Sequence, residues 1–413
     1  MSRKYTVILI IVIAAIVLAL GIFLLFFTSP AIQNTTGPSS NSPFGSYNGS
    51  SSTTPITSAD GNNSTASSSS DVQYINNPTS QLLKISTVPI AGAEVFDRKI
   101  NATTSVSIVR YIERATGHTD EYNHSTGALS ASSNTTIPSI YQAWWSSNTV
   151  LAQFIGQSKD LVKTFTGNLP ASTSPATQLI GGFLSDNIST LAISPKGNRV
   201  FTIQKGDSAL GYISNLDGSK KTSVLNFPFN EWVAQWPNEN TITLTTKPSS
   251  GALGFMYFLT TGGAMTKALG NITGLTTLTN PSLSYTIYSS SQNGSISAGI
   301  YNFSKNTYQQ FTSNPTLPEK CVWSKLNKTT AYCAVPTTIP SGNYPDDWYQ
   351  GSVSFVDNIY KIDMSIPTVQ LLYQLPTDQS IDAINLFLDA KEENLYFTNK
   401  SDYYLWGLTI KGL

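Results

Sequence analysis

Residues Leu191 to Leu216 read LAISPKGNRVFTIQKGDSALGYISNL, and this stretch decides the fold. It holds three short runs rich in β-branched and aromatic residues, and turn-forming residues separate them. Pro195 presets φ for a type I turn, and Gly197 tolerates the positive φ that closes it. A fourth run follows Asp217. Four antiparallel strands joined in this way make one blade of a β-propeller, so the sequence predicts an all-β propeller.

Weaker copies of this pattern recur along the chain. Their first hairpin turns are spaced by roughly 42 to 64 residues, a period typical of propeller blades. These turns lie near Asp97, Ser147, Lys196, Asn238, Ser282, Asn327 and Lys391. Seven turns predict seven blades, with six or eight as alternatives. The one long interval contains Pro336–Gln350, which we interpret as a loop inserted into blade six.

The two ends of the repeat region complement each other. The last unit has three strand-like runs, near Ile381–Leu388, Asn394–Thr398 and Tyr403–Ile410, and lacks a fourth. Gln81–Ser86 precedes the first complete unit and has no sheet of its own. We therefore expect this N-terminal segment to close the ring as the fourth strand of the last blade, which removes two exposed edges.

The turn Ser194–Asn198 resembles the Ser-Pro-Asp-Gly turn of the TolB-type, WD40-like propeller repeat. Lys196 stands where that repeat has an acidic residue, and the full form occurs in one blade only. The stretch Arg110–His118 also resembles membrane-anchored propellers with Ser/Thr-rich linkers from candidate-phylum bacteria. Both resemblances imply a propeller, and neither implies an activity.

The composition is that of a β-rich protein whose surface carries hydroxyls and amides. Charged residues make up 12% of the chain, aromatic residues 11%, and the formal net charge is +0. A chain without basic runs beyond its first residues is unsuited to neutralising many phosphates. We therefore do not expect a nucleic-acid partner.

Residues 1–28 are interpreted as a transmembrane anchor. Val7–Phe27 carries no charged side chain, and a helix of that length spans roughly 31 Å, close to the thickness of the hydrocarbon core. Arg3 and Lys4 precede it, so we expect the N-terminus in the cytoplasm and the rest outside the cell membrane. A cleaved signal peptide is the alternative, although such apolar regions are shorter.

Residues 29–79 are rich in Ser, Thr, Asn, Gly and Pro, and this composition predicts a flexible linker. A chain of about 50 such residues has an end-to-end distance of roughly 40 Å. Residues 80–413 then form the propeller.

The only two cysteines, Cys321 and Cys333, are symmetric about the turn at Asn327. In a hairpin they face each other directly, where β-carbons are close. An even cysteine count in an exported domain favours a disulfide, and a reduced pair is the alternative.

The only histidines, His118 and His124, share one strand face with Asp120 and Tyr122. Imidazoles and a carboxylate are suitable metal ligands. However, the ends of this row lie about 20 Å apart on a straight strand. We therefore favour a solvated outer strand, and we expect neither a metal nor a cofactor.

The inserted loop is the candidate ligand-binding site. Aromatic rings beside carboxylates can stack on sugars and accept hydrogen bonds from their hydroxyls, or ligate Ca²⁺. The candidate residues are Tyr344, Asp346, Asp347, Trp348 and Tyr349. The alternative is a loop that caps the ring with its aromatic residues packed inward. Five tryptophans in first runs are interpreted as packing between blades: Trp144, Trp145, Trp232, Trp236 and Trp323.

The sequence contains no nucleophile elbow, zinc-protease motif or phosphate loop. The prediction is a non-catalytic binding or scaffolding module at the cell envelope, with a protein or glycan partner. Two alternatives remain open. One is an envelope assembly factor, and the other is a glycan hydrolase that uses paired carboxylates. The candidate carboxylates of that hydrolase are Asp346, Asp347, Asp357 and Asp382.

Overall fold

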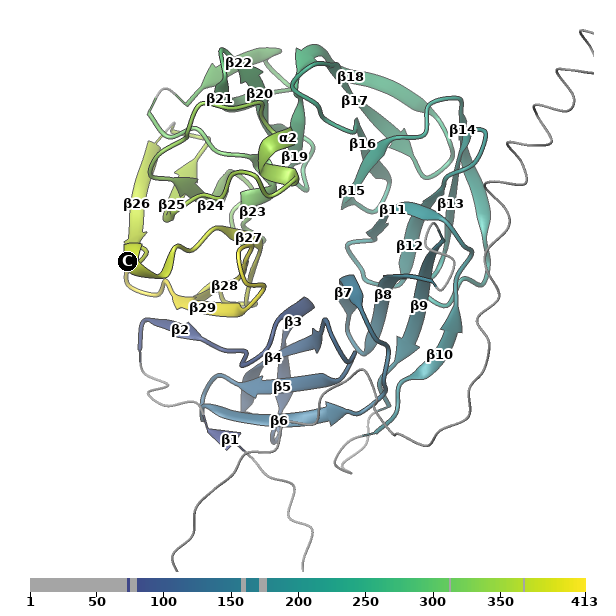
Figure 1. Cartoon of the computed structure of the whole chain (residues 1–413), viewed down its shortest axis with the longest axis vertical. Helices are drawn as coiled ribbons and strands as arrows, with labels where there is room; N and C mark the ends of the chain where they lie inside the picture. The colour runs from purple at the N-terminus through teal and green to yellow at the C-terminus, as the bar shows by residue number, and fades with distance from the viewer. Residues whose placement is uncertain (1–72, 75–79, 157–160, 171–176, 312, 367) are drawn as a thin grey trace, which may run out of the picture. The chain divides into compact units, whose positions relative to one another are not determined.

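A computed structural model describes residues 73–74, 80–156, 161–170, 177–311, 313–366 and 368–413. Its strands form seven antiparallel sheets, arranged as the blades of a propeller (Figure 1). In each blade the first strand is innermost. The prediction of an all-β, seven-bladed propeller is therefore confirmed.

Apart from β1 and β2, the strands of each blade follow one another in chain order. Blade one contains β3 (Ile90–Lys99), β4 (Ser105–Glu113), β5 (Thr119–Asn123), β6 (Ala128–Ser133) and β1 (Gln73–Tyr74). Blade two contains β7 (Ile140–Ser146), β8 (Thr149–Ile155), β9 (Val162–Asn168) and β10 (Ile180–Phe183). Blade three contains β11 (Ile188–Ile193), β12 (Arg199–Gln204), β13 (Ala209–Asn215) and β14 (Thr222–Phe227). Blade four contains β15 (Trp232–Asn238), β16 (Thr241–Thr246), β17 (Leu253–Thr260) and β18 (Met265–Thr273).

The remaining blades keep this order. Blade five contains β19 (Thr276–Thr279), β20 (Tyr285–Gln292), β21 (Ser295–Asn302) and β22 (Thr307–Gln310). Blade six contains β23 (Cys321–Trp323), β24 (Thr330–Pro336), β25 (Asp357–Asp363) and β26 (Thr368–Gln374). Blade seven contains β27 (Ala383–Leu388), β28 (Asn394–Asn399), β29 (Leu405–Thr409) and β2 (Leu82–Lys84). The short helices are η1 (Pro318–Lys320), α2 (Asp346–Tyr349) and η2 (Thr377–Gln379).

In blade three, the first hairpin turn forms as its sequence predicts. The backbone N–H of Gly197 donates to the carbonyl of Ser194 at 2.8 Å, and Gly197 has φ 71°. Ser194 Oγ also accepts from the N–H of Arg199, which fixes the first hairpin. The first hairpin of blade one differs from expectation. Asp97 lies inside β3, and the turn comes later, where the Asn101 side chain accepts from the N–H of Thr104.

The ring closes as predicted, because β2 is the outer strand of blade seven. Leu82 is paired with Leu408 and Lys84 with Trp406. The N–H of Thr409 donates to the carbonyl of Gln81 at 2.8 Å, which extends this ladder. The chain upstream also takes part, since β1, within the predicted linker, adds a fifth strand to blade one.

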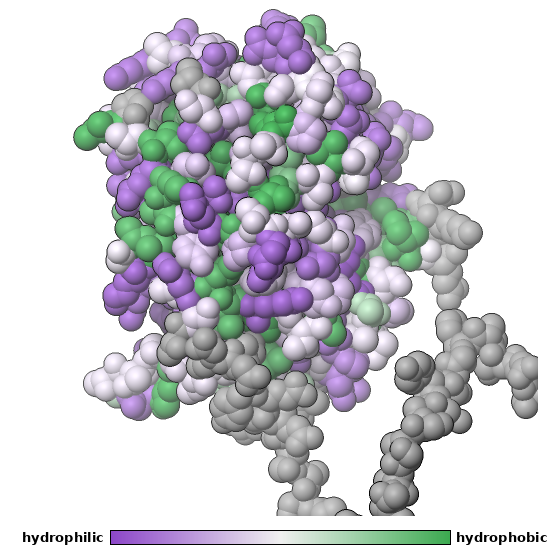
Figure 2. All heavy atoms as spheres, turned by 60° about the vertical axis from the view of Figure 1, so that its left-hand side comes forward, coloured by the Kyte–Doolittle hydropathy of each residue, from purple (hydrophilic) through white to green (hydrophobic). Residues whose placement is uncertain are grey.

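Seven clusters of buried apolar residues fill the seven interfaces between neighbouring blades. Phe201 and Trp232 share one such cluster between blades three and four, and Tyr111 and Tyr396 share the one at the closure. Trp144 is partly buried, and the other four tryptophans of the first strands are buried, as inter-blade packing requires. On the side of the propeller that carries β26, hydrophobic and hydrophilic residues are interspersed (Figure 2).

The predicted anchor and most of the predicted linker lie outside the described residues. In the part of the chain that is described, no helix is long and apolar enough to cross a membrane.

Candidate functional site

The insert of blade six comprises residues 337–356, between β24 and β25, and contains α2. It reaches two neighbouring blades. Asp346 Oδ2 accepts from the N–H of Ser250 in blade four at 2.5 Å. The N–H of Gly342 donates to the carbonyl of Gly294 in blade five at 2.8 Å. In Figure 1, α2 lies beside the inner strand β19. The insert is thus anchored across three blades.

Three aromatic residues of the insert point into the fold: Tyr344, Trp348 and Phe355. Tyr344 stacks on Phe355 with ring centroids 5.9 Å apart, and Trp348 stacks on the same ring at 6.2 Å. Tyr344 and Trp348 are buried, in an eighth apolar cluster that includes Leu317. Neither ring offers an open face to a sugar in this conformation.

The polar side chains of the predicted binding loop also have partners within the protein. Asp347 Oδ2 accepts from the N–H of Asn343 at 2.7 Å. Burial acts to raise the pKa of Asp346, but hydrogen bonds from Ser250 outweigh it and lower the pKa. Tyr349 is exposed, and its hydroxyl donates to Glu319 Oε1. The structure therefore brings the five candidate residues together mainly as a cap.

Beneath this cap lies a buried ion cluster formed by Lys320, Asp357 and Asp382. All three side chains are fully shielded from solvent, and Lys320 Nζ lies 2.7 Å from Asp357 Oδ2 and in contact with Asp382 Oδ1. Asp382 Oδ2 accepts from Trp348 Nε1 at 2.9 Å and from the N–H of Phe355 at 3.0 Å. The cluster thus ties the insert to blades six and seven.

Burial raises the pKa of Asp357 to about 6. Asp357 Oδ2 accepts from the N–H of Ala383 at 2.7 Å, whereas Oδ1 has no hydrogen-bond partner among the described residues. Asp357 and Asp382 were two of the carboxylates predicted for a hydrolase. A substrate cannot reach them without opening the cap, so their geometry is that of a structural ion cluster.

A second buried ion cluster lies in blade one, around Arg110. Its guanidinium donates to Glu121 Oε1 at 2.8 Å and to Glu94 Oε1 at 3.3 Å. It also lies over the rings of Phe96 and Trp145. Burial raises the pKa of Glu94 to about 7, because the charged form is deprived of water.

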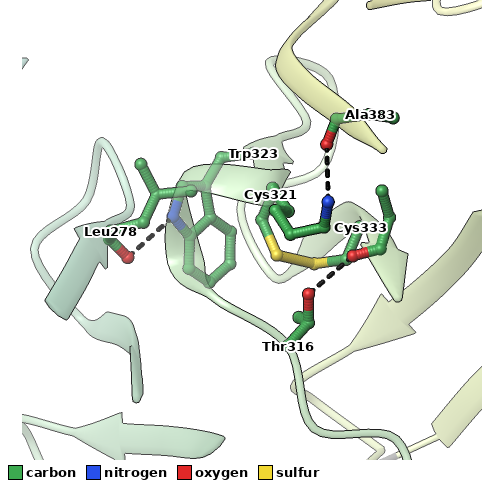
Figure 3. The surroundings of a disulfide bond; sticks show 8 residues. Leu278, Thr316, Cys321, Trp323, Cys333 and Ala383 are labelled. Atoms are coloured by element: carbon green, nitrogen blue, oxygen red, sulfur yellow. Dashed lines mark hydrogen bonds between the residues drawn. A yellow bond between two sulfur atoms is a disulfide. The ribbon is translucent and has the colours of Figure 1, made fainter. Parts of the chain in front are cut away.

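Cys321 and Cys333 form a disulfide across β23 and β24, with their Cα atoms 4.1 Å apart (Figure 3). The bridge is buried between blades five and six. Beside it, Trp323 Nε1 donates to the carbonyl of Leu278 in blade five at 3.1 Å. The predicted pairing of the two cysteines is present, and it has a structural role at an inter-blade interface.

The histidine row does not form a metal site. His118 precedes β5, and His124 follows it. Tyr122 between them is fully buried and β5 is paired on both sides, so the prediction of a solvated outer strand is wrong. His124 Nδ1 lies 3.3 Å from the hydroxyl of Tyr396. Within the described residues, no group of three potential ligands is placed to hold a metal ion.

Sequence reasoning missed a cavity of about 480 Å³ between blades two and three, which we call the blade two–three pocket. Strand ends and turns of the two blades supply its walls. The lining residues are Thr149, Thr166, Asn168, Ile180, Gly181, Gly182, Phe183, Asn198, Asn215, Leu216 and Asp217. The polar ones, apart from Asp217, carry amides and hydroxyls, which a sequence rich in Asn and Thr does not set apart from ordinary turn residues.

Among the described residues that line this pocket, Asp217 is the one with a charge. Hydrogen bonds from Ser219 lower the pKa of Asp217, so it is anionic at neutral pH. These bonds reach Oδ1, at 2.9 Å from the N–H and 2.7 Å from the hydroxyl of Ser219. Asp217 Oδ2 accepts from no other described residue. A carboxylate oxygen of this kind can accept a hydrogen bond from a bound ligand.

No protein-family model matches the sequence, and no curated protein is similar to it.

Several solved structures are similar to this chain. An oligogalacturonate lyase in complex with manganese has a TM-score of 0.50 at 10% identity, over 79% of this chain and 99% of that chain. The β-propeller domain of the Trilobed protease from Pyrococcus furiosus has a TM-score of 0.47 at 9% identity, over 78% and 96%. TolB from Acinetobacter baumannii has a TM-score of 0.40 at 10% identity, over 77% and 79%. At these identities the likeness is one of fold.

Proposed function

We propose that this chain is a single-pass, membrane-anchored β-propeller that serves as a non-catalytic binding or scaffolding module at the cell envelope. The apolar run Val7–Phe27 after Arg3 and Lys4 supports an anchor with the propeller outside. The disulfide supports the same location, because such bonds persist in oxidising compartments.

The observation that carries the proposal of binding is the chemistry of the blade two–three pocket. It offers amides, hydroxyls and apolar surface, and Asp217 is the one titratable group among its described lining residues. Binding sites combine apolar walls with a few placed polar groups in this way. A hydrolase of the paired-carboxylate type needs a second acid at about 5–10 Å, and none of the lining residues that the structure describes supplies it.

Capture of the partner from native membranes tests this function. The full chain, crosslinked in cells and purified, is expected to retain a discrete protein or glycan. A chain of residues 1–79 alone is the matched control, and it should retain nothing. Retention by that control would show that the propeller is not the binding part. If the retained species are envelope-building proteins that act together, the module is an assembly factor.

A release assay tests the hydrolase. The purified full chain, incubated with envelope glycans, should liberate no reducing sugar. Asp346 and Asp347 already accept hydrogen bonds from the protein backbone, so the variants Asp346→Asn and Asp347→Asn should behave as the parent does. If the parent chain releases sugar and either variant does not, the function is hydrolysis and not binding alone.

A further inference from the structure

We propose that Lys320 and Asp382 become joined by an isopeptide bond, which the chain forms without another enzyme. The bond is an amide between Lys320 Nζ and Asp382 Cγ. Lys320 ends η1, directly before the first strand of blade six, and Asp382 directly precedes β27 of blade seven. The bond therefore links two neighbouring blades. This inference goes beyond the proposed function, because it concerns the chain itself and does not depend on what the propeller binds.

The two reacting groups are held in contact and away from water. Lys320 Nζ contacts Asp382 Oδ1, and neither side chain has any exposed surface. Nζ also donates to the carbonyl of Ala383 at 3.1 Å, which fixes its position. Groups held in such contact can reach effective concentrations of about 10⁵ M or more. A condensation that is slow between free molecules can therefore proceed inside this fold.

The surroundings of Lys320 favour an uncharged product. The ring centroids of Trp348 and Phe355 lie 5.4 and 5.5 Å from its Nζ, and both rings are buried. Two charges that are removed from water lose their hydration, and their mutual attraction often does not offset this cost. An amide has no net charge, so its formation eliminates two buried charges.

Three donors hold the other oxygen of Asp382. Its Oδ2 accepts from Trp348 Nε1 at 2.9 Å, from the N–H of Phe355 at 3.0 Å and from the hydroxyl of Ser354 at 3.2 Å. Donors placed in this way stabilise the negative charge that develops on a carboxyl oxygen during nucleophilic attack. Oδ1, on the side of Lys320, is then the oxygen that leaves.

Asp357 is placed to transfer the protons. Its Oδ2 lies 2.7 Å from Lys320 Nζ, and burial raises the pKa of Asp357 to about 6. Both protonation states are therefore accessible near neutral pH, as general acid–base catalysis requires. Asp357 Oδ1 has no hydrogen-bond partner among the described residues, so it can hold a proton.

The reaction is a condensation that releases water. Asp357 takes a proton from the ammonium group of Lys320, and the nitrogen lone pair forms a bond to Asp382 Cγ. The bond between Cγ and Oδ1 breaks, and Oδ1 leaves as water with two protons from the nitrogen, transferred through Asp357. One proton stays on the amide nitrogen, and Asp357 returns to its starting state. The reaction needs no oxidant and no co-reactant.

Mass spectrometry of peptides from the purified full chain tests the proposal. The chain is reduced, alkylated and digested with trypsin, which does not cut after an acylated lysine. We expect one branched peptide that combines residues 306–325 with residues 362–391 and weighs one water less than their sum. Its fragmentation should place the branch at Lys320 and Asp382.

Asp357→Asn and Asp363→Asn form a matched pair. Asp363 lies at the other end of β25, where it accepts from Ser365. Asp357→Asn keeps an acceptor for the N–H of Ala383 and removes the group that transfers protons. The rate of crosslinking, measured at intervals after synthesis, should therefore fall by ~100-fold or more. Asp363→Asn should crosslink at the rate of the parent chain.

Other results overturn the proposal. These are separate linear peptides from the parent chain with a cut after Lys320, a branch at a different carboxyl group, or equal rates in Asp357→Asn and the parent chain. The peptides of the parent chain are decisive by themselves, so the test does not depend on whether a variant folds.

Discussion

The indole N–H of Trp348 links the insert to the buried ion cluster through Asp382. Trp348→Phe keeps an aromatic ring against Phe355 and removes this donor. Asp382 retains other donors, so we expect the free energy of unfolding to fall by about 1–2 kcal/mol. Chemical denaturation measures the change. Tyr349→Phe, which removes an exposed hydrogen bond to Glu319, is the control and should cost less; the reverse order would argue against the cap.

Glu94 makes stability depend on pH near neutrality. Its pKa is about 7 in the folded chain and about 4.5 in a free chain, so the folded state binds its proton more tightly. The stability that Glu94 contributes is complete below its pKa of about 4.5 in a free chain, and it is lost as pH rises through its pKa of about 7 in the folded chain. Between pH 5 and 7, the free energy of unfolding should therefore fall on the order of 1 kcal/mol per pH unit on account of this group.

Glu94→Gln tests this dependence, because the amide still accepts from Arg110 and does not titrate. Thermal unfolding from pH 5 to 8 should show a flatter profile in the variant than in the parent chain. His124, whose pKa burial lowers, acts in the opposite direction and is the same in both proteins. Parallel profiles would contradict the role of Glu94.

At the scale of elements, β2 decides whether the ring is closed. Ile85, just after β2, is buried, and its N–H donates to Leu405 at 2.8 Å. A chain that starts at Ser80 keeps β2 and should unfold cooperatively. A chain that starts at Val88 exposes the edge of β29 and should melt at a sharply lower temperature or aggregate. Calorimetry of both truncated chains measures the difference, and equal melting temperatures would mean that the closure adds no stability.

The disulfide closes a short loop, with a sequence separation of 12. In the chain-entropy account, such a loop contributes roughly 3 kcal/mol or less. Reduction of the exported protein, or Cys321→Ser with Cys333→Ser, should lower stability by no more than this and leave the ring folded. Mass spectrometry without reduction should find the two cysteines joined. Free thiols at both positions would contradict the pairing.

The sequence was most informative about the strands and the turns that join them. Alternating apolar residues and turn formers are local signals, so the blade three hairpin and the Cys321–Cys333 register were predictable. The closure was predictable because two incomplete units lay at the two ends. The hairpin turn near Asp97 was misplaced, since a long strand carries no internal signal that separates it from a turn.

Sites depend on contacts between blades, which carry no local pattern. The buried position of Lys320 was not predicted, because a lysine is normally exposed to solvent. Only the fold places it between Asp357 and Asp382. The blade two–three pocket was not predicted for the same reason, because its walls come from two blades.

At the scale of the whole molecule, the orientation of the chain in a membrane can be tested. With Arg3 and Lys4 before the apolar run, the propeller should lie outside the cytoplasm. Protease added to intact cells or spheroplasts should remove it, and a cytoplasmic protein should survive as the control. Full protection of the propeller in spheroplasts would exclude the proposed location.

The order of the first two strands has a mechanical consequence. β1 pairs with the outer edge of blade one, whereas β2, the next strand along the chain, completes blade seven. Tension applied to the chain before Gln73 reaches β1 first, and a two-residue pairing yields under small force. Its release would come before any load reached the ladder of β2. β1 would thus detach before β2, and its detachment would protect the closed ring from the pulling force.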